Sequence, residues 1–124
     1  MSWMFCGASS FNQPIGAWQT GKVTNMERMF QGASFNQPIG AWQTGKVMNM
    51  AYMFAGTSFN QPLGNWDTSA VTNMRNMFDH AGDFNQPLGD WKTGKVTDMQ
   101  CMFKDARSFN KRGPKFYHLG KIQR

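Results

Sequence analysis

An internal repeat of about 24–25 residues constrains this chain more than any other feature of its sequence. Two dipeptides mark it: Met-Phe begins at Met4, Met29, Met53, Met77 and Met102, and Phe-Asn begins at Phe11, Phe35, Phe59, Phe84 and Phe109. The spacing from each Phe-Asn to the next Met-Phe is constant, so the length varies only between Met-Phe and the following Phe-Asn. Extra residues are tolerated where a loop bulges into solvent, so this segment is expected to form an outer corner.

The constant part of the repeat has apolar residues at helical spacing. Val23, Met26, Met29 and Phe30 fall at i, i+3, i+6 and i+7, which covers about 120° of a helix surface. A threonine three residues before each valine is in a suitable N-cap position (Thr20, Thr44, Thr68 and Thr93). A glycine two residues after the phenylalanine, as at Gly32 and Gly56, suits a helix end. The pattern predicts a short helix in each turn, with its apolar face in the core.

The remaining part of the repeat follows the pattern Ser-Phe-Asn-Gln-Pro-Ile/Leu-Gly-x-Trp, and its proline disfavours a helix. Stacked extended segments would form a narrow parallel sheet there. The predicted fold is therefore a right-handed α/β repeat solenoid of leucine-rich-repeat-like form, with one short helix and one short strand per turn. An all-β coil is the alternative, and the three-and-four spacing of Val, Met and Phe argues against it.

Two regions differ in charge. Residues 1–110 are expected to form the solenoid, and residues 111–124 a basic, degenerate half-repeat that caps it. The net charge of +6 comes from the C-terminal end, because residues 1–103 carry six basic and six acidic side chains. The N-terminal residues lack the basic and apolar segments of a secretory signal, and no apolar stretch is long enough to span a membrane. The sequence begins part-way through a repeat.

The segment Phe59-Asn-Gln-Pro-Leu-Gly-Asn-Trp-Asp-Thr-Ser-Ala-Val-Thr-Asn-Met-Arg-Asn-Met-Phe78 resembles the repeat of BspA-like bacterial surface proteins. These leucine-rich-repeat-type proteins include surface proteins of Listeria and mycoplasmas. The resemblance extends to Asn110 and implies an interaction or adhesion module at the cell surface or outside the cell, without catalytic residues. The chain itself shows no export signal or anchor, so an intracellular or organellar assembly is the alternative location.

Several patterns resemble chemical sites but favour structural roles. Gly16 to Lys22 fits the first seven positions of a phosphate-binding loop, as do Gly40 to Lys46 and Gly89 to Lys95. Valine follows each of them where a Mg²⁺-binding hydroxyl is required. The tryptophan and methionine columns are expected to be core, and the Asn column to bond neighbouring turns. His80 and His118 look isolated, and Cys6 and Cys101 are expected to be buried or half-buried thiols four turns apart. We predict no catalytic residue, cofactor or metal site.

The candidate interaction surface comes from positions that differ between repeats and from the basic end. The pair between the two core methionines changes in every copy, so these side chains are expected to point outward. The candidate residues are Arg28, Tyr52, Arg75, Lys111, Arg112, Lys115, Phe116, Tyr117 and Arg124.

The leading functional hypothesis is a non-enzymatic scaffold for protein–protein interaction or adhesion. Its partner would be a protein that contacts the uncapped N-terminal end or the basic C-terminal end. A nucleic-acid partner is disfavoured, because the repeats supply no further positive surface. The alternative is a structural subunit of a larger multiprotein assembly, anchored by the basic C-terminal end.

Overall fold

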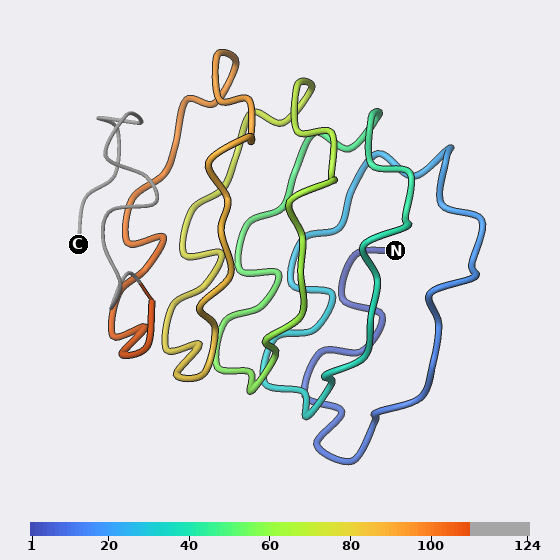
Figure 1. The fold of residues 1–124 in the computed structure, drawn as a ribbon, viewed down its shortest axis with the longest axis vertical. Helices are drawn as coiled ribbons and strands as arrows, with labels where there is room; N and C mark the ends of the chain where they lie inside the picture. The colour runs from blue at the N-terminus through green and yellow to red at the C-terminus, as the bar shows by residue number, and fades with distance from the viewer. Residues whose placement is uncertain (110–124) are drawn as a thin grey trace.

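The computed structural model describes residues 1–109, which wind into successive coils stacked side by side (Figure 1). Each coil consists of a turn row and a linking segment. The turn rows are residues 25–33, 49–57, 73–81 and 98–106, with residues 1–8 as a shortened first row. The linking segments are residues 9–24, 34–48, 58–72 and 82–97. Hydrogen bonds join residues one repeat apart, so one sequence repeat makes one coil.

The coils contain neither of the two elements that the sequence pattern predicts. Residues 1–109 include no helix and no strand longer than an isolated bridge. Parallel bridges pair Asn25 with Asn49, Asn49 with Asn73, and Asn73 with Asp98. The predicted right-handed, leucine-rich-repeat-like α/β solenoid, with a helix and a strand in each turn, is therefore wrong.

The turn rows replace the predicted helix. In the row 25–33, the N–H groups of Met29, Gln31 and Ala33 donate to the carbonyl three residues earlier, which closes consecutive β-turns. The N–H groups between them donate instead to the next coil, as in Arg28 to the Ala51 carbonyl at 2.9 Å and Phe30 to the Met53 carbonyl at 3.0 Å. Because alternate amides bond within the coil and across to the next, the row satisfies its backbone without helical i→i−4 bonds.

Backbone conformation explains why a helix cannot form here. Every described turn row has two residues with positive φ, four positions apart, such as Arg28 (57°) with Gly32 (70°), or Tyr52 (58°) with Gly56 (69°). A right-handed helix requires negative φ throughout. Apolar residues spaced three and four apart fit a row of consecutive turns as well as a helix, and this accounts for the incorrect prediction.

An asparagine or aspartate begins each complete row. The Oδ1 atoms of Asn25, Asn49, Asn73 and Asp98 each accept the N–H two residues later, at 2.9–3.0 Å. This is the Asx-turn that these two residue types favour. The first turn of each row is therefore set locally by one side chain.

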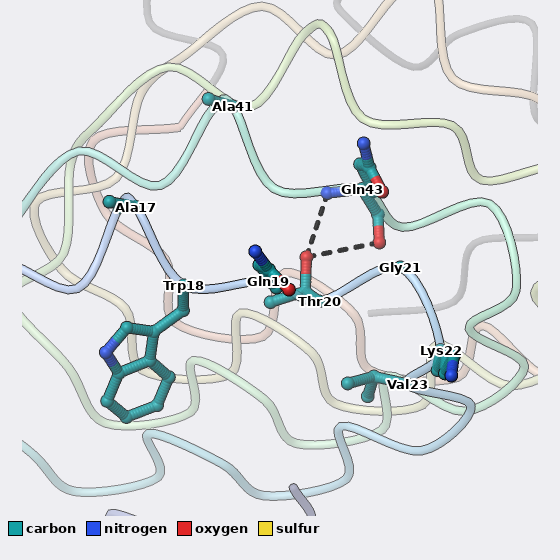
Figure 2. Close-up of a pocket in the computed structure, with 10 residues that line it drawn as sticks. Ala17, Trp18, Gln19, Thr20, Gly21, Lys22, Val23, Ala41 and Gln43 are labelled. Carbon is teal, nitrogen blue, oxygen red and sulfur yellow. Dashed lines mark hydrogen bonds between the residues drawn. The ribbon is translucent and has the colours of Figure 1, made fainter.

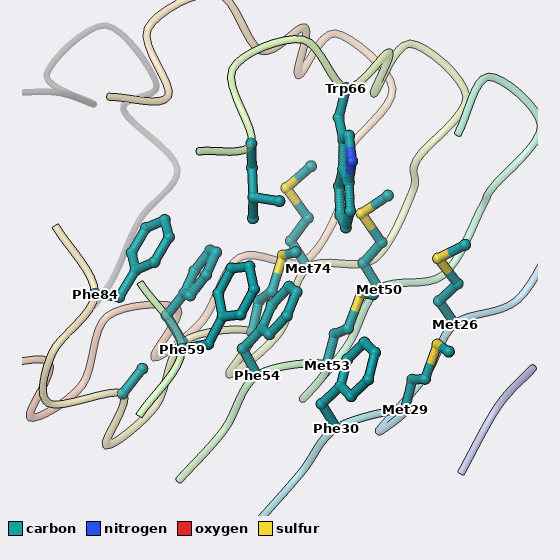
Figure 3. Close-up of a cluster of buried hydrophobic side chains, with 14 of the residues drawn as sticks. Met26, Met29, Phe30, Met50, Met53, Phe54, Phe59, Trp66, Met74 and Phe84 are labelled. Atoms are coloured by element: carbon teal, nitrogen blue, oxygen red, sulfur yellow. The ribbon is translucent and has the colours of Figure 1, made fainter. Parts of the chain in front are cut away.

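The core is a set of columns that run along the stack, as expected from the repeat. Two columns are phenylalanines: the two rings of each coil lie 3.9–4.4 Å apart. Equivalent rings of successive coils are 5.5–6.3 Å apart. Two methionine columns lie beside them (Figure 3), and all of the labelled methionines are fully buried. The core prediction fails for Met4, which is half exposed.

The linking segments stack through side chains that bond the backbone of the next coil. The predicted Asn ladder is confirmed: the amides of Asn36, Asn60 and Asn85 donate to the Oδ1 of the asparagine one coil earlier, at 2.8–3.0 Å. The indole N–H groups of Trp42, Trp66 and Trp91 donate to a buried carbonyl one coil earlier, at 2.9–3.0 Å.

The predicted helix caps have a different role. No helix begins after Thr20, Thr44, Thr68 or Thr93, so their assignment as N-caps is wrong. The hydroxyl of Thr68 donates to the Lys92 carbonyl and accepts from the Lys92 amide, both at 2.8 Å. A hydroxyl can donate and accept at once, so one threonine joins both backbone groups of the next coil.

The corner between Met-Phe and Phe-Asn absorbs the variation in length, as expected. A Cβ added at Gly82, in the longer corner between Phe78 and Phe84, would meet nothing within 4 Å. The Phe78 and Phe84 rings nevertheless stay 4.2 Å apart, like the pairs with shorter corners. The extra residue therefore goes into open space and leaves the core unchanged.

Candidate functional site

The turn rows carry one strip of side chains that differ from coil to coil, here called the turn face. It is formed by the pairs between the core methionines: Glu27-Arg28, Ala51-Tyr52, Arg75-Asn76 and Gln100-Cys101. The second residue of each pair has a φ of 53–58°, which fixes where its side chain leaves the backbone. Ala51 and Asn76 are buried, so the prediction that all of these positions point outward is wrong for those two.

Arg28 lies between two aromatic rings on the turn face. Its guanidinium carbon is 4.8 Å from the centre of the Trp3 ring and 4.1 Å from that of Tyr52. At these distances a cation is attracted to the aromatic face. Nη1 also donates to Gln31 Oε1 at 2.9 Å, whereas Nε is buried without a hydrogen-bond partner. The two rings, the Gln31 hydrogen bond and the Glu27 carboxylate 3.9 Å from Nε together position Arg28.

Tyr52 connects Arg28 to Arg75. The Tyr52 hydroxyl oxygen, which accepts a hydrogen bond from Arg75, and then the nearby Asp98 carboxylate raise the pKa of Arg75 above its ordinary value. Arg75 Nη1 lies 2.6 Å from Gln100 Oε1 and 3.4 Å from Asp98 Oδ2. The strip thus crosses successive coils as alternating aromatic and cationic groups.

The structure brings together three of the predicted interaction residues, Arg28, Tyr52 and Arg75. The sequence positions alone do not show that they touch, because Arg75 belongs to the first position of its pair and the others to the second. Trp3 was not among the predicted residues, although it occupies the position one repeat before Arg28. The other predicted residues lie outside the described residues: Lys111, Arg112, Lys115, Phe116, Tyr117 and Arg124.

A shallow groove of about 280 Å³ lies beside Tyr52. The small residues Gly32, Ala55 and Gly56 line it, together with Gln31 and the Asp79–His80 pair. Because the two glycines carry no side chain, the backbone itself forms part of this surface. An extended segment of a partner could approach the backbone closely here.

His80 is not isolated, contrary to the interpretation of the sequence. Its Nδ1 contacts Asp79 of the same turn row, and its Nε2 lies 3.2 Å from Asp105 Oδ2 in the next row. Asn76 Nδ2 donates to the other Asp79 oxygen at 2.7 Å. The signal was present in the sequence, since His80 and Asp105 are one repeat apart and so occupy the same repeat position.

The first linking segment forms the N-terminal edge of the stack, a surface lined by residues 16–23 with Ala41 and Gln43 (Figure 2). It encloses an open depression of about 730 Å³. Trp18 is 41% exposed here, whereas the other three tryptophans of its column are 3–4% exposed. The prediction that the whole column is core is therefore wrong for Trp18.

The same segment contains the first sequence that resembles a phosphate loop, Gly16 to Lys22. No helix follows it, so no helix N-terminus is available to a phosphate. The Thr20 hydroxyl donates to the Gln43 carbonyl at 3.3 Å and accepts from the Gln43 amide at 2.9 Å (Figure 2). The Thr20 hydroxyl is therefore occupied by hydrogen bonds to the next linking segment.

A family model matches this chain at residues 1–62 and again at residues 35–119. Its description is "Mycoplasma protein of unknown function, DUF285". The chain belongs to the DUF285 family. No curated protein and no solved structure matches it. The two overlapping matches agree with the repeat, since each covers more than two coils of the stack.

Residues 1–109 contain no group of three or more His, Cys, Asp and Glu side chains placed to hold a metal ion. They also contain no helix with the length and apolar character needed to cross a membrane. Cys6 and Cys101 are free and half-buried, as predicted. Within residues 1–109 of this DUF285 member, the turn face carries side chains that change from coil to coil, and the N-terminal edge exposes Trp18.

Proposed function

We propose that this protein is a non-enzymatic scaffold whose turn face binds a protein partner. One observation carries the proposal: the pair between the core methionines changes in every coil, above columns that hardly differ. On this face Tyr52 contacts Arg28 through a cation–π interaction and Arg75 through a hydrogen bond. Arginine and aromatic residues are the types that contribute most at protein interfaces.

The architecture beneath this face supports a binding role. Every second amide of a turn row bonds to the next coil, and the phenylalanine columns stack without interruption. The side chains on top are therefore held at fixed spacing before a partner arrives. Such preorganisation reduces the entropy lost on association.

The family and the resemblance to BspA-like surface repeats support a finer proposal, an adhesion module at the bacterial cell surface. A repeated scaffold with changeable side chains at one position can present different surfaces without altering its core. The groove beside Tyr52 would receive an extended segment of the partner.

A peptide library displayed on phage and selected on the full-length protein tests the turn face directly. We expect the selected peptides to lose binding to Arg28→Ala and Tyr52→Ala by at least about tenfold, which corresponds to about 1.4 kcal/mol. Binding to Lys46→Ala should stay unchanged, because Lys46 is exposed on a linking segment. Peptides that respond to Lys46→Ala and ignore both turn-face substitutions would contradict the proposed function.

A further inference from the structure

Arg28 has a turn row on each side of it along the stack. Its guanidinium carbon lies 4.8 Å from the ring centre of Trp3 in the preceding row and 4.1 Å from that of Tyr52 in the following row. A repeat placed before Met1 would stack on the outer side of Trp3 and would not come between these groups. The surroundings of Arg28 therefore do not depend on where the sequence begins.

The hydrogen-bond donors of Arg28 are used in part. A guanidinium carries five N–H donors. Nη1 donates to the neutral Gln31 Oε1 at 2.9 Å, and Nε is buried without a hydrogen-bond partner. Nη2 makes no hydrogen bond within residues 1–109, and unlike Nε it is not buried. The edge of the guanidinium that carries Nη2 is therefore open to solvent on the turn face.

The positive charge of Arg28 has no close counter-charge within residues 1–109. Glu27 Oε2 lies 3.9 Å from Nε, and no other carboxylate of these residues pairs with Arg28. A hydrogen bond between a charged N–H group and a carboxylate is shorter, at about 2.7–2.9 Å. Arg75 differs, because its Nη1 contacts both Gln100 Oε1 at 2.6 Å and Asp98 Oδ2 at 3.4 Å. Arg28 thus keeps more of its capacity to bind a negatively charged group.

We infer that the partner of the turn face is a polypeptide segment with an acidic side chain, whose carboxylate bonds the open edge of Arg28. This inference rests on the proposed function and names the chemistry of its partner. The planar guanidinium matches a carboxylate in shape and bonds it more strongly than a neutral acceptor. Because Trp3 and Tyr52 hold the guanidinium in position before binding, less side-chain entropy is lost when the carboxylate arrives.

The test uses peptides selected by phage display on the full-length protein, resynthesised with each Asp changed to Asn and each Glu to Gln, one at a time. We expect one of these changes to weaken binding to the wild-type protein by at least about tenfold. The same change should have little effect on binding to Arg28→Gln, because the two groups that interact are then both neutral. It should keep its full effect on Lys46→Gln, the matched control that removes a positive charge from an exposed linking-segment residue.

Nuclear magnetic resonance of the wild-type protein gives a second measurement that does not depend on a variant that folds. The Arg28 Nε–H signal should shift when the acidic peptide binds, and much less with the matched amide peptide.

The outcomes separate this inference from the proposed function. Peptides that lose binding to Arg28→Ala and Tyr52→Ala but tolerate every Asp and Glu replacement would overturn the inference and leave the proposed function intact. A carboxylate whose effect disappears in Arg75→Gln, and not in Arg28→Gln, would also overturn it. Peptides that bind equally well to both turn-face variants would contradict the inference and the proposed function together.

Discussion

At the scale of single residues, the turn rows depend on backbone conformation more than on side-chain type. The first left-handed position of a turn row holds Trp, Arg, Tyr, Asn or Cys, and the second holds glycine in three rows and His or Asp in the other two. A non-glycine residue with positive φ carries a cost of about 1–2 kcal/mol. The turn rows keep this conformation because backbone hydrogen bonds to the neighbouring coils offset its cost.

Gly56 provides a direct test of this conformational cost. Its φ is 69°, and an added Cβ would make only an ordinary contact with Gly32 Cα at 3.9 Å. Gly56→Ala should therefore lower the free energy of unfolding by about 1 kcal/mol through backbone strain alone. Urea denaturation measures the change, and Gly82→Ala in open space is the matched control. Equal effects of the two substitutions would show that positive φ is not the cause.

The indole hydrogen bond of Trp66 is a second feature at this scale. Nε1 donates to the buried Ile39 carbonyl at 3.0 Å, and this carbonyl also accepts the Trp42 N–H at 3.1 Å, so Trp66→Phe would remove one of its two donors. We expect a loss of about 1 kcal/mol in unfolding free energy from the lost hydrogen bond. Trp18→Phe, at the exposed edge, should change stability by less than about 0.5 kcal/mol. A larger effect at Trp18 would contradict the assigned burial of this column.

The carboxylate of Asp67 should titrate abnormally. The side chain of Ser69, then its backbone amide, bonds Asp67 and lowers its pKa below the ordinary 3.8. The stabilisation from the ionised carboxylate is thus present above pH 3.8 and is lost as the pH falls through the lowered pKa. An NMR titration of the Asp67 carboxyl carbon should show this pKa, and Ser69→Ala should raise it. An unchanged midpoint in that variant would remove Ser69 as the cause.

At the scale of elements, the turn row and the linking segment stack by different means. The turn row uses backbone amides, which any residue except proline supplies, so its outward side chains are free to vary. The linking segment uses Asn, Thr and Trp side chains, so these three positions are the same in every coil. This difference explains why the pairs on the turn face change from coil to coil while the stacking positions of the linking segments do not.

The threonine that joins neighbouring linking segments is predicted to be essential to the stack. Thr68→Val keeps the shape but leaves the Lys92 amide and carbonyl without their partner. We expect a loss of roughly 2–4 kcal/mol in unfolding free energy. Thr72→Val is the control, because the Thr72 hydroxyl makes one exposed bond, to the Met48 carbonyl at 3.2 Å. Thermal unfolding that ranks Thr72→Val as the worse substitution would contradict the role given to Thr68.

At the scale of the whole molecule, stability should be a sum over coils and their contacts. Within residues 1–109, the backbone hydrogen bonds between coils join immediate neighbours, at separations of one repeat. The coils should therefore be removable in whole repeats, provided that the columns of Asn, Thr, Phe and Trp stay aligned.

Deleting residues 49–72 removes one full repeat and joins Met48 to Asn73, which occupies the same repeat position as Asn49. We expect this variant to fold cooperatively with a lower denaturation midpoint. Deleting residues 49–71 instead shifts every later column by one position and should prevent folding. Near-ultraviolet circular dichroism of the stacked tryptophans distinguishes the two. Similar spectra from both deletions would show that alignment of the columns does not determine the fold.

The sequence by itself determined the period, the core columns, the Asn ladder and the corner that absorbs extra residues. These follow from which residues recur and where length varies, and both are local properties. The tertiary structure alone decided between helix and consecutive turns, because the Val-Met-Met-Phe spacing fits both. That choice depends on amides such as Arg28 N–H reaching the carbonyl of Ala51, which is distant in sequence and lies in the next coil. The contacts of Tyr52 with Arg28 and Arg75 depend in the same way on neighbouring coils. Trp18 is exposed because no described residue stacks on its outer side.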